Sequence, residues 1–216
     1  MDRLYVPRHF GIEGEAEARA LVDTVGTAHL VTVAADGTPD ATFLPVLWRG
    51  DRLVGHVARA NPHWQAIGDG APGLAVVTGP DAYVSPSWYA SKREHGRVVP
   101  TWNYSAVHLR GPVRVVDDTD WLLELVTALT DRHEAGAGRH DAWAVADAPE
   151  RYVAGQLRAI VGVEMAVEQV EGKAKLSQNR SDADREGVVA GLDGTPDQAV
   201  ADAVRAALEA DRAAEG

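Results

Sequence analysis

The sequence contains no cysteine among its 216 residues, and this absence removes a whole class of chemistry. Disulfide bonds, zinc sites built on thiolates and iron–sulfur clusters all depend on the cysteine side chain. Long apolar runs are missing as well, because no stretch of about eighteen consecutive apolar residues occurs, so we expect no membrane-spanning helix. The segment from Met1 to Pro7 lacks the apolar stretch of a secretory signal, and we therefore expect a cytoplasmic protein.

Positive charge is scarce. The chain has 21 Lys and Arg against 32 Asp and Glu, which gives a formal net charge of −11. Duplex DNA is a dense line of negative charge, and proteins that hold it usually present a basic face. The sequence also contains no recognisable helix-turn-helix with such a face. We therefore do not expect direct nucleic-acid binding, although a local basic patch could still hold a phosphate group.

Several catalytic signatures are absent too. Gly11-Ile12-Glu13-Gly14 does not follow a predicted strand, so it is not a dinucleotide-binding fingerprint. The sequence has neither a Gly-x-Ser-x-Gly elbow nor a His-Glu-x-x-His zinc motif. Hydrolase and zinc-protease functions therefore have little support.

The pattern of apolar residues predicts short antiparallel strands with peripheral helices. Strands are expected over residues 28–34, 41–48, 53–58, 74–78, 82–84, 107–116 and 161–170, with a hairpin at Asp36-Gly37. Helices are expected over residues 13–25, 62–67, 121–129, 147–159, 182–192 and 197–212. Asp147 is the expected cap of the fourth of these, while 85–101 and 134–141 are expected to be loops. Successive short antiparallel strands indicate a barrel or sandwich, here as one domain over residues 1–192 with a helical extension over 193–216.

Two histidines lie in the segment from Gly55 to Trp64. His56 ends a predicted strand on the same face as Val54, and His63 follows the turn at Asn61-Pro62. Imidazole is a common metal ligand, so both could bind a metal. The alternative is that His56 is satisfied by hydrogen bonds within its strand and that His63 lies on the surface.

Aromatic and hydroxyl side chains gather between Gly79 and Tyr89, where Trp88 accompanies Ser85 and Ser87. Such a set suits a ring-shaped ligand, with stacking on one side and polar contacts on the other. The alternative is a rigid aromatic loop that packs on its own barrel.

Basic residues concentrate downstream. Residues 85–110 contain four basic side chains and one acidic one, although the whole chain is acidic. Residues 173–180 add Lys175, Ser177, Gln178 and Arg180 directly after a predicted strand. Both segments suit a phosphate or carboxylate ligand. The alternatives are pairing with acidic surface elsewhere and a turn before the next helix.

Together these motifs resemble the PaiB family. The resemblance runs from about residue 4 to 192 and is carried by segments 5–10, 55–64, 79–89, 100–104, 107–108, 160–162 and 175–180. It implies an α+β fold, a mostly antiparallel split β-barrel like those of flavin reductases and pyridoxamine phosphate oxidases. It also implies a flavoprotein that binds FMN as a homodimer, with two cofactor sites at the subunit interface.

Relatives in this family are commonly named negative transcriptional regulators. The resemblance therefore implies a regulator that acts through cofactor or small-molecule chemistry. A related branch, the piperazate synthases, holds haem b and forms a nitrogen–nitrogen bond in an N-hydroxylated ornithine. A haem enzyme with His56 as axial ligand, or a flavin-dependent oxidoreductase, is therefore the alternative. One departure stands out, since many relatives read Thr-His-Leu-Pro where this chain has Thr42-Phe43-Leu44-Pro45.

The residues and the resemblance together define a set of candidate cofactor-binding residues. They are His56, Asn61, His63, Trp64, Ser85, Ser87, Trp88, Lys92, Trp102, Asn103, His108, Arg110, Lys175, Ser177, Gln178 and Arg180. Lys92, Arg110, Lys175 and Arg180 are the candidates for holding an FMN phosphate. Trp102 and Tyr104 are the candidates for the dimer interface.

Overall fold

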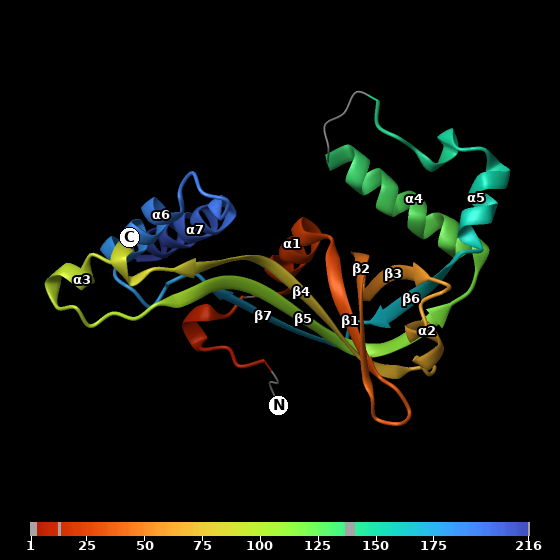
Figure 1. The fold of residues 1–216 in the computed structure, drawn as a ribbon, viewed down its shortest axis with the longest axis horizontal. Coiled ribbons are helices and arrows are strands. Elements are labelled where there is room, and N and C mark those ends of the chain that lie inside the picture. The colour runs from red at the N-terminus through yellow and green to blue at the C-terminus, as the bar shows by residue number, and fades with distance from the viewer. Residues whose placement is uncertain (1–3, 13, 137–140, 216) are drawn as a thin grey trace. The chain divides into compact units, whose positions relative to one another are not determined.

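The computed structural model describes residues 4–12, 14–136 and 141–215. The strands are β1 (Thr27–Val33), β2 (Pro39–Arg49), β3 (Arg52–Ala58), β4 (Ala71–Val84), β5 (Thr101–Val116), β6 (Ile160–Ala166) and β7 (Gln169–Lys175). The α-helices are α1 (Glu15–Val25), α2 (His63–Ala66), α3 (Ser91–Glu94), α4 (Thr119–Gly136), α5 (Glu150–Leu157), α6 (Asp182–Leu192) and α7 (Gln198–Glu215). Short 3₁₀ turns are η1 (Arg8–Phe10), η2 (Pro86–Trp88) and η3 (Val145–Asp147) (Figure 1). None of the helices in these ranges has the length and apolar character needed to cross a bilayer.

The strands form a sheet in the order β4-β1-β2-β3-β6-β5-β7, with a further pairing between β4 and β5. The predicted hairpin at Asp36-Gly37 joins β1 to β2. Gly37 has φ of 86°, a left-handed conformation that glycine adopts without strain. The Asp36 carboxylate accepts a hydrogen bond from the Thr38 amide at 2.9 Å, which closes the turn and fixes the register.

The chain divides into two compact units. One, which we call the barrel unit, comprises residues 22–77 and 108–170. The other, the tail unit, comprises the segment up to residue 21, residues 78–107 and the segment from residue 171 onward. Strands β4 and β5 contribute residues to both units, so these units cut across the expected division at residue 192.

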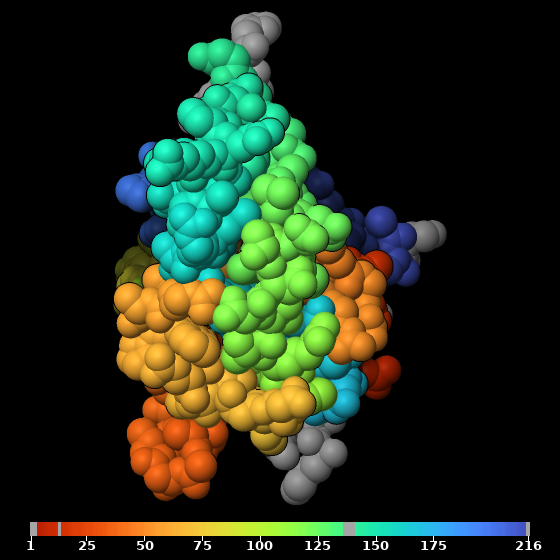
Figure 2. All heavy atoms as spheres, turned by 90° about the vertical axis from the view of Figure 1, so that its right-hand side faces the viewer, coloured from red at the N-terminus to blue at the C-terminus, as the bar shows by residue number. Residues whose placement is uncertain are grey.

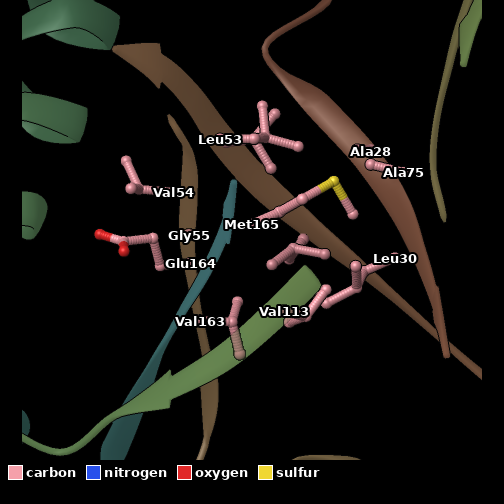
Figure 3. A pocket seen from close by; sticks show the side chains of 12 residues that line it. Ala28, Leu30, Leu53, Val54, Gly55, Ala75, Val113, Val163, Glu164 and Met165 are labelled. Atoms are coloured by element: carbon pink, nitrogen blue, oxygen red, sulfur yellow. The ribbon is translucent and has the colours of Figure 1, made fainter. Parts of the chain in front are cut away.

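The barrel unit has a tightly packed apolar interior. Leu30, Leu53, Val163 and Met165 meet there around a cavity of only about 10 Å³ (Figure 3). That volume is at the lower limit for a single water molecule, so the interior is a core and not a ligand site. The carboxylate of Glu164 points away from these side chains, as the close-up shows, and pairs with Arg114 at 2.8 Å.

Helix α4 covers part of the outside of the barrel unit. Leu125 and Leu129, one turn apart on this helix, pack on Leu47 and Val54 from β2 and β3. Burying four such side chains contributes on the order of 1.5–3 kcal/mol each relative to exposure, which is enough to anchor the helix.

The tail unit has a second core, between helices α6 and α7 and the aromatic loop. Val188 and Leu192 of α6 pack with Val200 and Val204 of α7. The indole of Trp88 lies on Gly191, where an added Cβ would come within 2.3 Å of the ring. The helical extension is therefore part of this core.

Three strand predictions need correction. Residues 74–78 and 82–84 belong to one continuous strand, β4, in which Pro80 is tolerated at an exposed position. Strand β5 begins at Thr101, six residues before the predicted start. The predicted strand 161–170 is two strands, β6 and β7, which lie on either side of β5 in the sheet order.

The predicted cap of helix α5 is also wrong. Helix α5 begins at Glu150 after Pro149, while the Asp147 carboxylate accepts the Ala144 amide at 2.8 Å and so closes η3. Helix α4 extends to Gly136, into the segment predicted as a loop, and residues 137–140 lie outside the described residues.

Candidate functional site

The candidate cofactor-binding residues fall into both units. His56, Asn61, His63, Trp64, His108 and Arg110 lie in the barrel unit. Ser85, Ser87, Trp88, Lys92, Trp102, Asn103, Lys175, Ser177, Gln178 and Arg180 lie in the tail unit. Each group forms its own network of contacts and is described separately.

His63 is a core residue of the barrel unit. It is 2% exposed, so the expectation that it lies on the surface is wrong. Its Nε2 shares a hydrogen bond with the Thr32 hydroxyl and its Nδ1 with the Thr42 hydroxyl, each at 2.8 Å. Both ring nitrogens are therefore engaged, and neither is available to a metal.

Asn61 and Trp64 hold the turn that leads into His63. The Asn61 side chain donates to the Thr42 hydroxyl at 3.1 Å and accepts from the His63 amide at 3.0 Å. The Trp64 indole donates to the Arg59 carbonyl at 2.9 Å. These polar groups satisfy one another, which favours a structural role for this motif.

His56 differs from His63 because a buried polar atom lacks a partner. Its Nδ1 makes no hydrogen bond to the described residues. In the register of β3 and β6 it lies opposite Gly162, and the ring of Trp121 packs against that glycine. Burial lowers the pKa of His56, so the neutral imidazole is favoured. His56 is thus the histidine with ligand capacity in this motif.

His108 and Arg110 lie two residues apart on β5, within the barrel unit, and both are partly buried. No group of three or more histidine or carboxylate side chains in the described part of the chain has the arrangement of a metal site.

In the tail unit, a strained turn follows β7. Ser177 has φ of 66°, a left-handed conformation that costs a residue with a Cβ about 1–2 kcal/mol. Its hydroxyl accepts a hydrogen bond from the Asn103 amide at 3.0 Å, and Asn103 is fully buried. The Gln178 side chain accepts from the Leu176 amide and donates to the Ala174 carbonyl, each at 2.7 Å. Asn103 and Ser177 therefore bind each other, and Gln178 bonds the backbone beside them, so that three predicted site residues fix the turn.

Three cations lie next to that turn, and we call them the cationic cluster: Lys173 and Lys175 at the end of β7, and Arg180 after the turn. Lys173 is 8% exposed and donates to the Tyr5 carbonyl at 3.0 Å, with its amine 5.4 Å from the ring centre of Tyr104. Lys175 donates to the Thr101 hydroxyl. Arg180 lies 4.8 Å from the ring centre of Tyr89.

The charge of the cationic cluster is not balanced by an ion pair among the residues that the structure describes. Within the described ranges, no carboxylate forms an ion pair with Lys173, Lys175 or Arg180. Burial lowers the pKa of Lys175, Tyr104 opposes this shift, and the charges of Lys173 and Arg180 lower the pKa further. An anion bound beside Lys175 would raise this pKa, because a nearby negative charge favours the protonated amine.

Sequence reasoning missed Lys173, although the signal was present. Lys173 and Lys175 are two residues apart on one strand and therefore lie on the same face of the sheet. The strand itself was not predicted, because most residues of β7 are polar.

The remaining polar candidates in the tail unit lie on η2 and α3. The Ser85 hydroxyl accepts the Ser87 amide at 3.2 Å, and Lys92 donates to the Ser87 hydroxyl at 3.0 Å. These contacts hold the loop itself, and none of them joins Lys92 to the cationic cluster.

Two exposed aromatic side chains lie near the cationic cluster: Tyr5, which is 81% exposed with the Lys173 amine 5.4 Å from its ring centre, and Trp102. Trp102 is 53% exposed, lies edge-on to Tyr83 at 6.3 Å between ring centres, and directly follows Thr101, the partner of Lys175. Trp102 can therefore stack on a planar ligand without moving the core.

Comparison with known proteins shows clear relatives. Residues 4–169 match the family described as "Putative FMN-binding domain". The chain is 32% identical over 190 residues to Protease synthase and sporulation protein PAI 2 of Bacillus subtilis, covering 86% of this chain and 87% of that protein. An alignment that covers so much of the chain necessarily includes residues 173–180, which lie beyond the family match.

Solved structures share the fold. The FAD and haem binding protein of Mycobacterium smegmatis superimposes with a TM-score of 0.58 at 24% identity, over 84% of this chain and 80% of that one. The flavocytochrome Anf3 of Azotobacter vinelandii gives a TM-score of 0.58 at 18% identity, over 81% and 74%. The expected split barrel, mostly antiparallel with peripheral helices, is confirmed.

Proposed function

Because the chain belongs to this FMN-binding domain family, and its resemblance to PaiB is confirmed by PAI 2, we propose that it binds FMN. In this proposal Lys173, Lys175 and Arg180 hold the phosphate. The observation that carries the assignment is that, among the described residues, none of the three forms an ion pair with a carboxylate.

The residues present fit an FMN phosphate. A phosphomonoester brings close to two negative charges at neutral pH and three acceptor oxygens. Two ammonium groups and a guanidinium supply matching charge and donors. In a chain of net charge −11, three neighbouring cations that form no ion pair with a carboxylate in the described ranges are hard to explain by solvation alone.

A bound flavin supplies a ring that takes up and returns one or two electrons. The chain would bind and orient it. Trp102 offers an exposed surface for stacking, and the turn at Ser177 keeps Lys175 and Arg180 at fixed positions on either side of it.

The phosphate assignment is tested by titrating flavin fluorescence with FMN and with riboflavin, which lacks the phosphate. We expect FMN to bind at least tenfold more tightly, a difference of about 1.4 kcal/mol or more. Lys175→Met should weaken FMN binding about tenfold and leave riboflavin unchanged. Lys92→Met removes an equal charge from the loop and is the matched control. Equal losses from both variants would place the phosphate elsewhere.

A haem-binding function is the second candidate, and the free Nδ1 of His56 favours it. The absorption spectrum of the purified protein separates the two, since haem gives a sharp Soret band and flavin two broad bands. If haem is present, His56→Ala should abolish or strongly shift the Soret band. His63→Ala should not remove an axial ligand, because both ring nitrogens of His63 already form hydrogen bonds with threonine hydroxyls.

We also propose that any effect on transcription acts through this cofactor or a small molecule in the cytoplasm, without direct DNA reading. The acidic net charge supports this. A gel-shift titration at physiological salt should show no sequence-specific complex, and a specific complex would contradict the proposal.

A symmetric homodimer is the proposed assembly. Phe43 is 62% exposed on β2 and Val33 is 54% exposed on β1, which leaves an apolar outer face on this hairpin. His29, the cross-strand partner of Phe43, has its ring centre 5.2 Å away. Light scattering should report two copies, with Phe43→Glu shifting the protein toward one. Trp102 and Tyr104 are the other proposed interface residues. Trp102 is exposed, so Trp102→Glu tests it by the same measurement, whereas Tyr104 is partly buried and is less suited to this substitution.

A further inference from the structure

Helices α4 and α5 and the turn η3 enclose a groove on the outside of the barrel unit. Its volume is about 620 Å³, within the range of small-molecule sites. Figure 2 shows the cyan segment of η3 and α5 beside the green helix α4. Every lining residue belongs to the barrel unit, so the groove shares no residue with the proposed FMN phosphate site.

The groove is lined by one stripe from each helix. From α4 come Thr119, Leu123, Thr127 and Asp131, which are spaced four residues apart. This stripe differs from the one carrying Leu125 and Leu129, which packs on the sheet. From α5 come Glu150, Val153, Ala154 and Leu157, again on one face.

Small side chains keep the groove open. Four alanines line it, at positions 144, 146, 148 and 154, together with two threonines. Leucines at these positions would let the helices interdigitate and fill the space, as they do where α4 meets the sheet. The segment before α5 is held by hydrogen bonds, since the Trp143 amide donates to Glu134 and the Ala144 amide to Asp147. These hydrogen bonds fix the position of the segment that forms one side of the groove.

The charge on the lining has a single sign. Asp131 and Glu150 are the charged residues that line it, and neither pairs with a cation in the part of the chain described. Glu150 is explained by its place in the first turn of α5, where the helix dipole favours a carboxylate. Asp131 lies in the C-terminal half of α4, outside the first turn, where the helix dipole does not favour a carboxylate.

We propose that this groove binds a small organic cation, with an apolar body against Leu123, Val153 and Leu157 and a protonated amine beside Asp131. An amine would be attracted by the carboxylates of Asp131 and Glu150. Neutral ligands of the same shape gain only the apolar contacts, and anions are repelled. The lining therefore selects for charge as well as shape.

The experiment uses three probes of nearly equal shape: 4-phenylbutylamine, 4-phenylbutanol and 4-phenylbutyrate. Each is titrated into the full-length protein, and the methyl resonances of Leu123, Val145 and Val153 are followed by NMR. We expect saturable shifts with the amine, binding of the alcohol that is about tenfold weaker, and none with the carboxylate. Equal binding of amine and alcohol, or no shift with any probe, would overturn the proposal.

Variants locate the effect. Asp131→Asn should lower the affinity for the amine to that of the alcohol, while Glu124→Gln, on another face of α4, should leave it unchanged. Ala154→Phe fills the groove and should abolish binding of both probes, with thermal unfolding confirming that the variant is folded. If Ala154→Phe instead halves the mass measured by light scattering, a second copy of the chain occupies the groove and the proposal is wrong.

Discussion

The turn at Ser177 allows a paired substitution in which one variant removes a hydrogen bond and the other also relieves strain. Ser177→Ala deletes the hydroxyl and leaves the fully buried Asn103 side chain without its partner. An unsatisfied buried amide costs about 1–3 kcal/mol. Alanine keeps the left-handed backbone at φ of 66° and its strain of about 1–2 kcal/mol.

Ser177→Gly loses the same hydrogen bond but adopts this backbone without strain. We therefore expect it to be roughly 1 kcal/mol more stable than Ser177→Ala, although both are less stable than the native protein. Urea denaturation measures the difference as a shift in midpoint at constant slope. Equal midpoints for the two variants would show that Ser177 is not held in a left-handed conformation. A Ser177→Ala protein as stable as the native one would show that Asn103 finds another partner.

Three further predictions concern packing and pH. Gly191→Ala should lower the melting temperature, because its Cβ would come within 2.3 Å of the Trp88 ring. Gly155→Ala in α5 is the matched control: its Cβ would meet no atom closer than 3.9 Å, so the free energy of unfolding should rise by up to about 1 kcal/mol. His63→Leu should destabilise the barrel unit by about 2–4 kcal/mol, since two threonine hydroxyls lose their partner, and a urea midpoint within error of the native one would contradict this. Burial lowers the pKa of His56 below its usual 6.5, so the unfolded chain takes up the proton more readily, and stability should fall as the pH drops from above 6.5 through the lowered value. In His56→Gln this fall should be smaller when melting temperatures at about pH 7.5 and 5.5 are compared, and an unchanged fall would exclude His56 as its source.

The elements that could be predicted from the sequence are those with a strong local signal. Strands β1 to β3 are short apolar segments separated by clear turn signals at Asp36-Gly37 and Gly50-Asp51, and α6 begins after the cap at Ser181, so their bounds came close. Strand β7 could not be found this way, because most residues from Gln169 to Lys175 are polar. Its pairing with β5, which makes it a strand, depends on the folded sheet and leaves no local pattern in the sequence. Periodicity detects burial, and this strand buries mainly Lys173.

The candidate site shows the same limit. The motif ending in Arg180 was recognisable as a set of donors, and the structure brings Lys175, Ser177 and Gln178 into one turn with it. The sequence could not show that Asn103 forms a hydrogen bond with Ser177, 74 residues further along the chain. Nor could it show that both ring nitrogens of His63 form hydrogen bonds with threonine hydroxyls. Partners so distant in the chain become apparent only once the fold places them together.

The order in which the chain is synthesised gives the division into two units a further meaning. The barrel unit is complete once residue 170 has emerged from the ribosome, whereas the tail unit needs both ends of the chain. The amide of Ile12 bonds the Gly172 carbonyl at 3.2 Å, and the amide of Leu4 bonds the Glu171 side chain at 3.2 Å. The N-terminal segment must therefore wait through most of translation for these partners. We expect nascent chains that stop before residue 171 to fold the barrel unit yet lack the cationic cluster, so that an FMN phosphate held there, as proposed above, would bind only after Lys173, Lys175 and Arg180 have been synthesised.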